Sequence, residues 1–247
     1  MLKLLKNHNP LEAVSGSRLA VGYSDRASGN MSLSCGDTSK TLEDRKSFLA
    51  SLGIDYKNLV CAKQAHGSNV KYVNEARKGN GALDYASSIV DTDGFVTDVK
   101  GLPLGIFTAD CLSVFLYDPI KPAVGLVHAG WRSSKENIVS AALELMRARF
   151  KTNPPELYVG FGPRIRNCCY EVTSEFKGNF TTGLTERQGR LYLDLAQVNR
   201  KQLIDSGVRP EKILDPGICT ACGKEDLFSF RREGKDCGRI LSVIMLK

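Results

Sequence analysis

The chain has 247 residues, of which 42% are apolar and 25% are charged, as in ordinary soluble globular proteins. No apolar run approaches the roughly 18 to 20 residues of a membrane-spanning helix, so we expect no membrane partner. The net charge is +7, but the basic residues are dispersed and no basic block alternates with aromatic residues, which argues against a nucleic-acid partner. No linker or repeat divides the chain, and we expect one domain over residues 1–247.

Nine short segments are predicted to form strands, because they are rich in β-branched and aromatic residues and are bounded by Gly, Pro or Asp. In chain order they are residues 18–23, 59–63, 68–73, 94–96, 104–108, 113–117, 123–128, 156–160 and 240–245. Helices are predicted over residues 41–52, 135–150 and 195–206, and long loops over residues 74–88 and 177–189. The irregular succession of strands and helices favours an α+β fold, with mixed β-sheets flanked by helices, over a doubly wound parallel sheet.

The helix predicted over residues 135–150 has the clearest signals. Its apolar residues recur at helical spacing, and Ser133 followed by Glu136 is a capping-box pattern that predicts its start. The amino terminus of a helix presents free N–H groups and partial positive charge, so an anion can bind there. Arg132 stands at this junction, where it could donate paired hydrogen bonds to a phosphate or form an ordinary surface ion pair.

Three side chains at the ends of predicted strands have the chemistry of metal ligands. His66 and His128 lie in glycine-containing turns, and Cys111 lies in a polar break between two strands. Two imidazoles and one thiolate suit zinc, and three protein ligands leave a fourth position for water, whose pKa the ion lowers to about 7. Spacing alone does not bring the three residues together, because such residues beside apolar strands are more often packed separately.

The chain contains eight cysteines, and their oxidation state depends on the compartment. Polar residues at positions 7–9 interrupt the basic start of the chain before a signal core can form, so we expect a cytoplasmic protein with reduced thiols. Five of the cysteines are Cys168, Cys169, Cys219, Cys222 and Cys237. Cys219 and Cys222 form a C-x-x-C pair, which either builds a second, structural zinc site with the others or belongs to a set of buried thiols.

Motifs spread along nearly the whole chain carry a family resemblance. They are Gly29-Asn30-Met-Ser-Leu-Ser-Cys-Gly36-Asp37 with Arg45, Gln64-Ala-His66-Gly67, Asp93-Gly-Phe-Val-Thr-Asp98, Thr108-Ala-Asp-Cys111, His128-Ala-Gly-Trp-Arg132, Gly162-Pro163 with Cys168-Cys-Tyr-Glu-Val172, and Phe228-Ser-Phe-Arg231-Arg232 with Gly238-Arg239. In this order the motifs resemble those of the YfiH/DUF152 family, also called the laccase-domain or multicopper polyphenol oxidase family.

The resemblance implies a layered α/β/β/α arrangement (CNF1/YfiH-like) and a catalytic zinc ion bound by His66, Cys111 and His128. It also implies phosphorolysis of purine nucleosides such as adenosine, inosine or methylthioadenosine by inorganic phosphate, with adenosine deamination as a companion activity. The older family label implies copper oxidation of phenols. A multicopper centre requires many more imidazoles than the three in this sequence, so a single copper ion is only a less favoured alternative to zinc.

Further residues are assigned roles in this chemistry. Asp110, beside the presumed sulfur ligand, would shuttle protons or else hold the backbone in place. Arg132 and Arg45 would bind phosphate, and Asn30 and Gln64 would orient the substrate. The single tryptophan either forms the floor of a purine pocket or belongs to the core.

Two other classes of function remain open. One is an amidase-like hydrolase of a peptidoglycan precursor, a role also attributed to bacterial members of the family, in which the metal or a Cys111 thiolate would act. The other is a non-enzymatic module in which zinc only stabilises the fold.

Overall fold

The computed structural model describes residues 9–247. Its α-helices are α1 (Glu12–Ser15), α2 (Thr38–Ser51), α3 (Trp131–Lys135), α4 (Ile138–Phe150), α5 (Leu195–Asp205) and α6 (Phe230–Glu233). A four-stranded sheet has the order β1 (Leu19–Tyr23), β13 (Ile240–Leu246), β5 (Leu104–Thr108) and β2 (Val60–Cys61). A six-stranded sheet has the order β12 (Ile213–Leu214), β8 (Tyr158–Phe161), β6 (Leu112–Asp118), β7 (Ala123–Ala129), β4 (Gly94–Thr97) and β3 (Val70–Tyr72). A three-stranded sheet has the order β10 (Leu184–Arg187), β11 (Arg190–Leu193) and β9 (Glu171–Val172).

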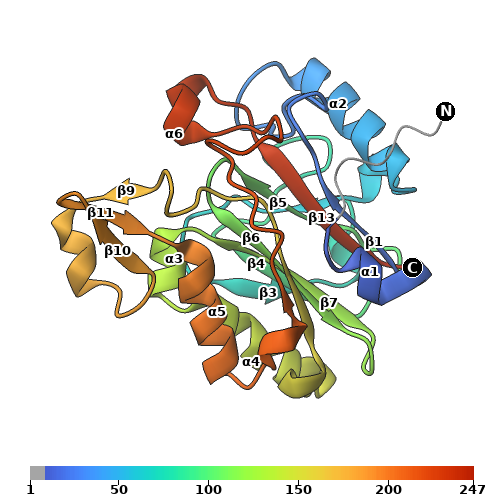
Figure 1. Ribbon diagram of the computed structural model, residues 1–247. Coiled ribbons are helices and arrows are strands. Elements are labelled where there is room, and N and C mark those ends of the chain that lie inside the picture. The colour runs from blue at the N-terminus through green and yellow to red at the C-terminus, as the bar shows by residue number, and fades with distance from the viewer. Residues whose placement is uncertain (1–8) are drawn as a thin grey trace.

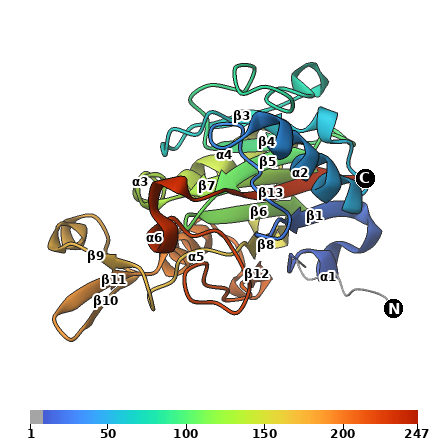
Figure 2. The same ribbon diagram turned by 90° about the horizontal axis from the view of Figure 1, so that it is seen from above.

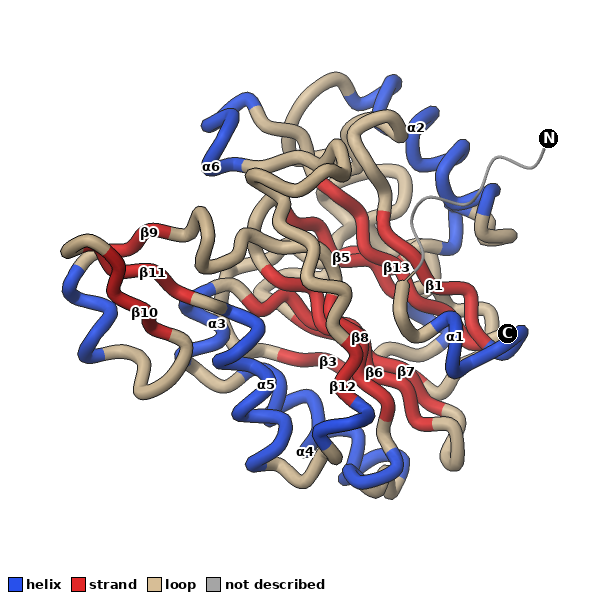
Figure 3. The backbone as a smooth tube through the Cα atoms, viewed as in Figure 1, coloured by secondary structure: helices blue, strands red, loops and turns tan. Residues whose placement is uncertain are grey.

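The two larger sheets and two groups of helices form four layers (Figures 1 and 3). The sheets pack face to face, with β5 and β13 against β7. Helix α2 covers the outer face of the four-stranded sheet, and α4 packs against β3, β4 and β7 on the outer face of the six-stranded sheet. The three-stranded sheet projects to one side of these layers (Figure 2). The chain therefore has the expected α/β/β/α arrangement.

Successive side chains along a strand point to opposite faces of its sheet, and three apolar layers result from this alternation. Phe115 and Leu126 of the six-stranded sheet meet Ile244 of the four-stranded sheet in the space between the sheets. Their chain neighbours Val114 and Val127 point to the opposite face, where they pack under α4. Each sheet is thus covered on both faces, which explains why its strands are apolar along most of their length.

The prediction of an α+β fold with mixed sheets is confirmed, and all nine predicted strands are present, β5 with the predicted bounds and the others with shifted ends, whereas the two-residue strands β9 and β12 were not predicted. The prediction of a loop over residues 177–189 is wrong in its second half, because β10 forms a hairpin with β11 there. Gln188 and Gly189 have φ angles of 50° and 71°, the left-handed pair that a two-residue turn of type I′ requires. Apart from Leu184, β10 is polar and exposed, so it lacks the apolar alternation that reveals a strand.

The prediction of one helix over residues 135–150 is wrong at its start. Helical structure begins at Trp131 as α3, is interrupted at Asn137, whose φ of 65° is left-handed, and resumes as α4. The expected capping box does not mark either start. Ser133 lies inside α3, and its hydroxyl donates a hydrogen bond of 2.9 Å to the backbone carbonyl of His128. This contact ties α3 to the end of β7.

The other two predicted helices are present as α2 and α5, and an aspartate caps each of them. Asp37 accepts a hydrogen bond of 2.7 Å from the backbone N–H of Lys40, and Asp194 accepts one of 2.9 Å from Ala196. Within residues 9–247, no helix combines the length and the apolar content that crossing a bilayer would require. The polar residues at positions 7 and 8, used above to argue against an export signal, lie outside the described residues.

The left-handed residue between α3 and α4 gives a test of the fold. Asn137→Ala should lower the free energy of unfolding by about 1 kcal/mol, because a Cβ-bearing residue other than Asn or Asp is strained at this φ. Asn137→Gly relieves that strain and should stay closer to the wild type. Urea unfolding followed by circular dichroism measures both. An alanine variant as stable as the wild type would show that this conformation is not a constraint.

Candidate metal centre and its cavity

The structure brings His66, Cys111 and His128 together, with their ligand atoms all within 4.8 Å of one another. Cys111 directly precedes β6 and His128 lies near the end of β7, and these strands pair with Ser113 opposite His128. His66 comes from the loop after β2, and its φ of 61° turns the chain sharply at this point. Three segments that are distant in sequence thus meet where strands begin or end.

A fourth residue, Asp93, holds this centre in place, and the sequence analysis assigned it no role. One carboxylate oxygen accepts hydrogen bonds from the backbone N–H of His66 at 3.0 Å and from Nδ1 of His128 at 2.8 Å. The other oxygen accepts from the backbone N–H groups of Ala65 and Gly67. Asp93 therefore fixes the loop that carries one imidazole and the ring orientation of the other. With Nδ1 bound to Asp93, Nε2 of His128 remains available to a metal ion.

The three residues interact electrostatically as well. Burial raises the pKa of Cys111, but His128 and His66 outweigh this effect and lower it to about 6. For His128, burial lowers the pKa, but the Cys111 sulfur and the Asp93 carboxylate raise it to about 9. A thiolate and an imidazolium are therefore paired at neutral pH when no metal ion is bound. A divalent cation can replace the proton in this arrangement, because it needs the thiolate and the neutral imidazole.

Gly130, which follows β7, leaves space beside the ligands. A Cβ atom at this position would lie 3.1 Å from Sγ of Cys111 and 3.4 Å from Cδ2 of His66. The first distance is shorter than ordinary van der Waals contact, so any side chain here would push against the sulfur ligand. The glycine is required by this close approach and not by its φ, which is −74°.

The three ligands open into a cavity of about 590 Å³, a volume within the range of small-molecule sites. Aromatic side chains form part of its wall, and they are Tyr85, Phe107, Trp131, Tyr170 and Phe230. Four arginines also line it, namely Arg45, Arg132, Arg231 and Arg239, whereas Asp110 is the only acidic residue among the lining residues. The cavity therefore combines apolar ring surfaces with a positive potential, which suits an anion beside a flat, uncharged ring.

The two arginines predicted to bind phosphate differ in whether their guanidinium groups already make hydrogen bonds. In residues 9–247, the guanidinium of Arg132 makes no hydrogen bond or ion pair, and it lies 4.4 Å from the centre of the Trp131 ring. Arg45 is only 1% exposed and donates to the backbone carbonyls of Met31, Gly81 and Ala82. Its burial lowers its pKa. Arg132 is free to bind a ligand, whereas Arg45 mainly fastens two loops.

The two residues expected to orient the substrate also use their side chains for hydrogen bonds with backbone groups. The amide of Gln64 exchanges two hydrogen bonds with the backbone of Phe107, so Gln64 lines the cavity but positions a neighbouring ring. Asn30 is not among the lining residues. Its amide binds the carbonyls of Ser32 and Cys35 and the backbone N–H of Arg239. Asn30 therefore shapes the loop that borders the cavity.

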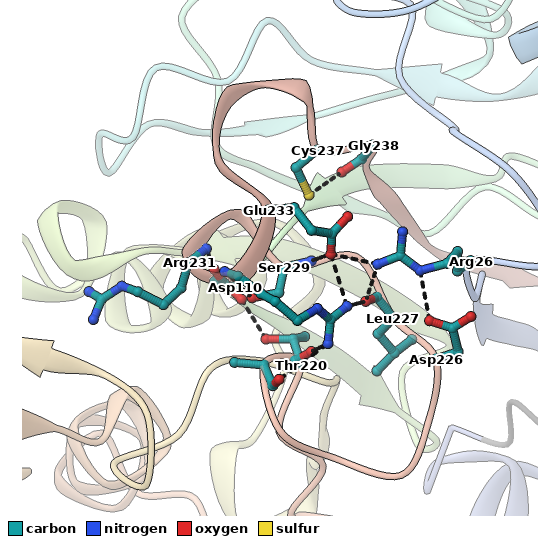
Figure 4. Close-up of polar contacts among 12 residues, drawn as sticks. Arg26, Asp110, Thr220, Asp226, Leu227, Ser229, Arg231, Glu233, Cys237 and Gly238 are labelled. Carbon is teal, nitrogen blue, oxygen red and sulfur yellow. Dashed lines mark hydrogen bonds and ion pairs between the residues drawn. The ribbon is translucent and has the colours of Figure 1, made fainter.

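Asp110 is held at both carboxylate oxygens (Figure 4). One oxygen accepts a hydrogen bond of 2.6 Å from the Thr220 hydroxyl, and the other accepts one of 2.7 Å from the backbone N–H of Arg231. Its φ of 94° is unusual for a residue with a side chain, and the next residue is the sulfur ligand. These contacts favour the interpretation that Asp110 positions Cys111 over the interpretation that it carries protons.

Asp93, Tyr170, Arg231 and Arg239 are site residues that the analysis of residue types and spacing missed. Each of them lies within a motif quoted above, so the family pattern was the available signal. Burial and the neighbouring Cys111 charge raise the pKa of Tyr170, which keeps its hydroxyl protonated as a hydrogen-bond donor. The guanidinium of Arg231 donates to the backbone carbonyls of Cys169 and Glu171, so it joins the projecting sheet to the cavity wall.

Comparison with known proteins gives consistent results. Residues 14–247 match the model of a family described as multi-copper polyphenol oxidoreductase laccase. The purine nucleoside phosphorylase YlmD of Geobacillus stearothermophilus is 33% identical over 228 residues, which cover 88% of this chain and 83% of the relative. The adenosine deaminase RL5 of an unknown prokaryotic organism is 29% identical over 257 residues, covering 100% and 98% of the two chains. The crystal structure of the hypothetical protein YfiH from Bacillus licheniformis superposes with a TM-score of 0.88 at 28% identity, covering 93% of each chain.

The contacts of Asp93 predict its effect on metal binding. Asp93→Asn keeps the side-chain size but removes the charge that orients His128, and it should weaken zinc affinity about 10- to 100-fold. Competition with a chromophoric chelator measures this affinity. Asp98→Asn is the matched control, because Asp98 is an exposed carboxylate of the same motif that accepts a hydrogen bond from the Tyr72 hydroxyl, away from the candidate metal ligands. Equal zinc affinity in all three proteins would show that Asp93 does not position a ligand.

The electrostatic pairing predicts the titration of Cys111 in metal-free protein. As the pH rises, the ultraviolet absorbance of its thiolate should appear with a midpoint near the pKa of about 6, instead of the ordinary 9.0. The difference between wild type and Cys111→Ser isolates this signal from the other cysteines. Conversely, His128 should keep its proton until the pH passes about 9, which histidine NMR would detect. A Cys111 midpoint at its ordinary value would contradict the ion pair.

Proposed function

This chain belongs to the multi-copper polyphenol oxidoreductase laccase family, which includes YfiH, and we propose that it is a zinc-dependent purine nucleoside phosphorylase that also deaminates adenosine. Relatives named for both activities support the choice of reactions. The observation that carries the proposal is the free guanidinium of Arg132, which shares one cavity with an aromatic wall and the His66, Cys111 and His128 centre. Because Cys111 and the other free cysteines require a reducing environment, we place the enzyme in the cytoplasm.

The side chains of the centre fit one zinc ion better than a copper cluster. His66, Cys111 and His128 offer two imidazole nitrogens and one sulfur, a ligand set typical of catalytic zinc with an open position. Copper clusters that oxidise phenols need many imidazoles, whereas the sequence has three histidines and the third, His8, lies outside the described residues. When bound, zinc would supply a Lewis acid and lower the pKa of water at its open position.

The aromatic wall supports the proposal of a purine substrate. Trp131 and Tyr170 line the cavity beside the metal centre, and Trp131 is held by Phe176, with ring centres 5.1 Å apart. A purine can stack on such rings while its ring nitrogens and exocyclic group meet the polar side of the cavity. The Tyr170 hydroxyl, kept protonated by its raised pKa, would donate a hydrogen bond to the base or the ribose.

Arg132 would bind the second substrate, inorganic phosphate. In phosphorolysis a phosphate oxygen forms a bond to C1′ of the ribose while the bond from C1′ to the base nitrogen breaks, and the leaving base takes up a proton. A planar guanidinium can hold two phosphate oxygens and fix the direction of attack. The other three arginines of the cavity donate to backbone carbonyls and supply a positive field around this position.

One observation favours a different reaction. The lowered pKa of Cys111, about 6, makes its sulfur a thiolate at neutral pH, and a thiolate could attack the carbonyl of an amide as in cysteine hydrolases. The amidase-like hydrolysis of a peptidoglycan precursor is therefore the second candidate. The zinc-stabilised module without activity is the third.

Incubation with adenosine and phosphate tests these proposals. The protein with zinc should release adenine in a phosphate-dependent reaction, and Cys111→Ala should release none because a metal ligand is lost. Arg132→Gln should raise the KM for phosphate at least about tenfold, the effect of losing one charged hydrogen-bonding partner, with unchanged zinc content. Conversion of adenosine to inosine without phosphate should be affected less.

Lys135→Gln is the matched control, because Lys135 is an exposed cation of the same helix outside the cavity. Equal phosphate KM values for Arg132→Gln and the wild type would remove Arg132 from the phosphate site. Turnover of a muramyl-amino-acid substrate with no reaction on nucleosides would favour the hydrolase. Unfolding on chelation with no turnover of either substrate would favour the structural module.

A further inference from the structure

Four cysteines outside the cavity form a second cluster. The sulfur atoms of Cys168, Cys169, Cys219 and Cys222 all lie within 4.8 Å of one another, and those of Cys168 and Cys222 are 3.5 Å apart. In a tetrahedral zinc site with Zn–S bonds of about 2.3 Å, neighbouring sulfurs are about 3.8 Å apart. The cluster therefore already has nearly the dimensions of a four-thiolate zinc site.

Two tight turns bring the cysteines together. In the first turn, the backbone N–H groups of Cys169 and Tyr170 both donate to the carbonyl of Arg166. In the second turn, the N–H of Gly223 donates to the carbonyl of Cys219. A Cβ at position 223 would lie 2.3 Å from that carbonyl oxygen, so only glycine allows the turn to close. Structural zinc sites are commonly built from pairs of cysteines two to four residues apart, a spacing that Cys219 and Cys222 have, whereas Cys168 and Cys169 are adjacent.

The backbone joins the two turns before any metal ion binds. Arg164 pairs with Cys219 in a parallel bridge, with hydrogen bonds from its N–H to Ile218 and from the N–H of Thr220 to its carbonyl. This bridge fixes the distance between the two cysteine pairs. The site is therefore preorganised, and an ion entering it would not have to fold the loops.

The close spacing of the four sulfurs favours a cation among them. Four thiolates so close together repel one another unless a cation lies between them. A divalent ion would displace the thiol protons to solvent and balance most of this charge.

We propose that Cys168, Cys169, Cys219 and Cys222 bind a second zinc ion with a structural role. A closed set of four thiolates leaves no open position for a substrate, in contrast to the three-ligand centre in the cavity. A disulfide between Cys168 and Cys222, whose sulfurs are 3.5 Å apart, would leave Cys169 and Cys219 unpaired, whereas one ion can bind all four sulfurs.

This second ion would stabilise the wall of the cavity. Cys169 is followed by Tyr170, which lines the cavity, and Cys219 is followed by Thr220, whose hydroxyl holds Asp110. Fixing the two turns therefore fixes a ring beside the substrate and, through Asp110, the position of the sulfur ligand. The ion would act on the reaction only through these positions.

Metal analysis of the full-length protein tests the proposal without using activity. The wild type should contain two zinc ions per chain, and Cys222→Ser and Cys111→Ala should each contain one. Cys35→Ser should keep two, because Cys35 is a partly buried thiol that belongs to neither group. One zinc ion in the wild type that disappears in Cys111→Ala would overturn the proposal, whether or not the protein turns over nucleosides.

Cobalt substitution gives a second measurement that does not depend on the folding of a cluster variant. In Cys111→Ala, cobalt(II) should produce intense thiolate-to-metal absorption bands, and in this variant these bands can arise only from the four-cysteine cluster. The four thiols should also resist alkylation until a chelator is added. Free alkylation of all four thiols without chelator would contradict the site. A mass lower by two hydrogens, with Cys168 and Cys222 linked, would replace it with a disulfide.

Discussion

The buried carboxylate of Asp93 is the contact on which the metal centre depends. It precedes β4 in the six-stranded sheet, yet it binds the three consecutive backbone N–H groups of the loop after β2, which belongs to the other sheet. The same side chain orients His128. Burial alone would raise the pKa of Asp93, but the groups that donate hydrogen bonds to it lower the pKa and stabilise the charged carboxylate. One side chain thus couples the relative position of two sheets to the geometry of two candidate metal ligands.

The sequence predicted nine of the ten strands of the two large sheets, because these strands are short and mostly apolar, and it missed β12, which has only two residues. It also placed the ligands His66, Cys111 and His128 at strand ends, where the family pattern suggested that they meet. The hairpin of β10 and β11 escaped prediction because β10 is polar and exposed after Leu184, so it lacks apolar alternation, and its turn is formed by Gln188 and Gly189. The capping-box pattern at Ser133 gave a wrong helix start, because the Ser133 hydroxyl donates to the backbone carbonyl of His128 at the end of β7.

The same limit applies to the residues around the cavity. Arg45, Asn30 and Gln64 are the polar residue types expected in a binding site, but each makes hydrogen bonds with backbone groups of distant loops. A sequence shows which residues are polar and does not show which backbone groups they satisfy. Arg132 has the same chemistry as Arg45, but its guanidinium has no hydrogen-bond partner within residues 9–247, because it lies on the exposed side of a short helix while Arg45 lies beneath two loops. Only the three-dimensional arrangement separates an arginine that is free to bind a ligand from one that fastens loops.

The strand order of the four-stranded sheet has a consequence for biosynthesis. Strand β13 lies between β1 and β5, and Leu19 of β1 pairs with Leu246. While the ribosome makes the chain, β1 therefore has to wait until residues 24–239 have been made before its partner emerges. Pairings over such a separation are slow to form and leave apolar strand edges uncovered in the meantime. Strands β1 and β5 thus stay without the strand that lies between them until β13 has been made.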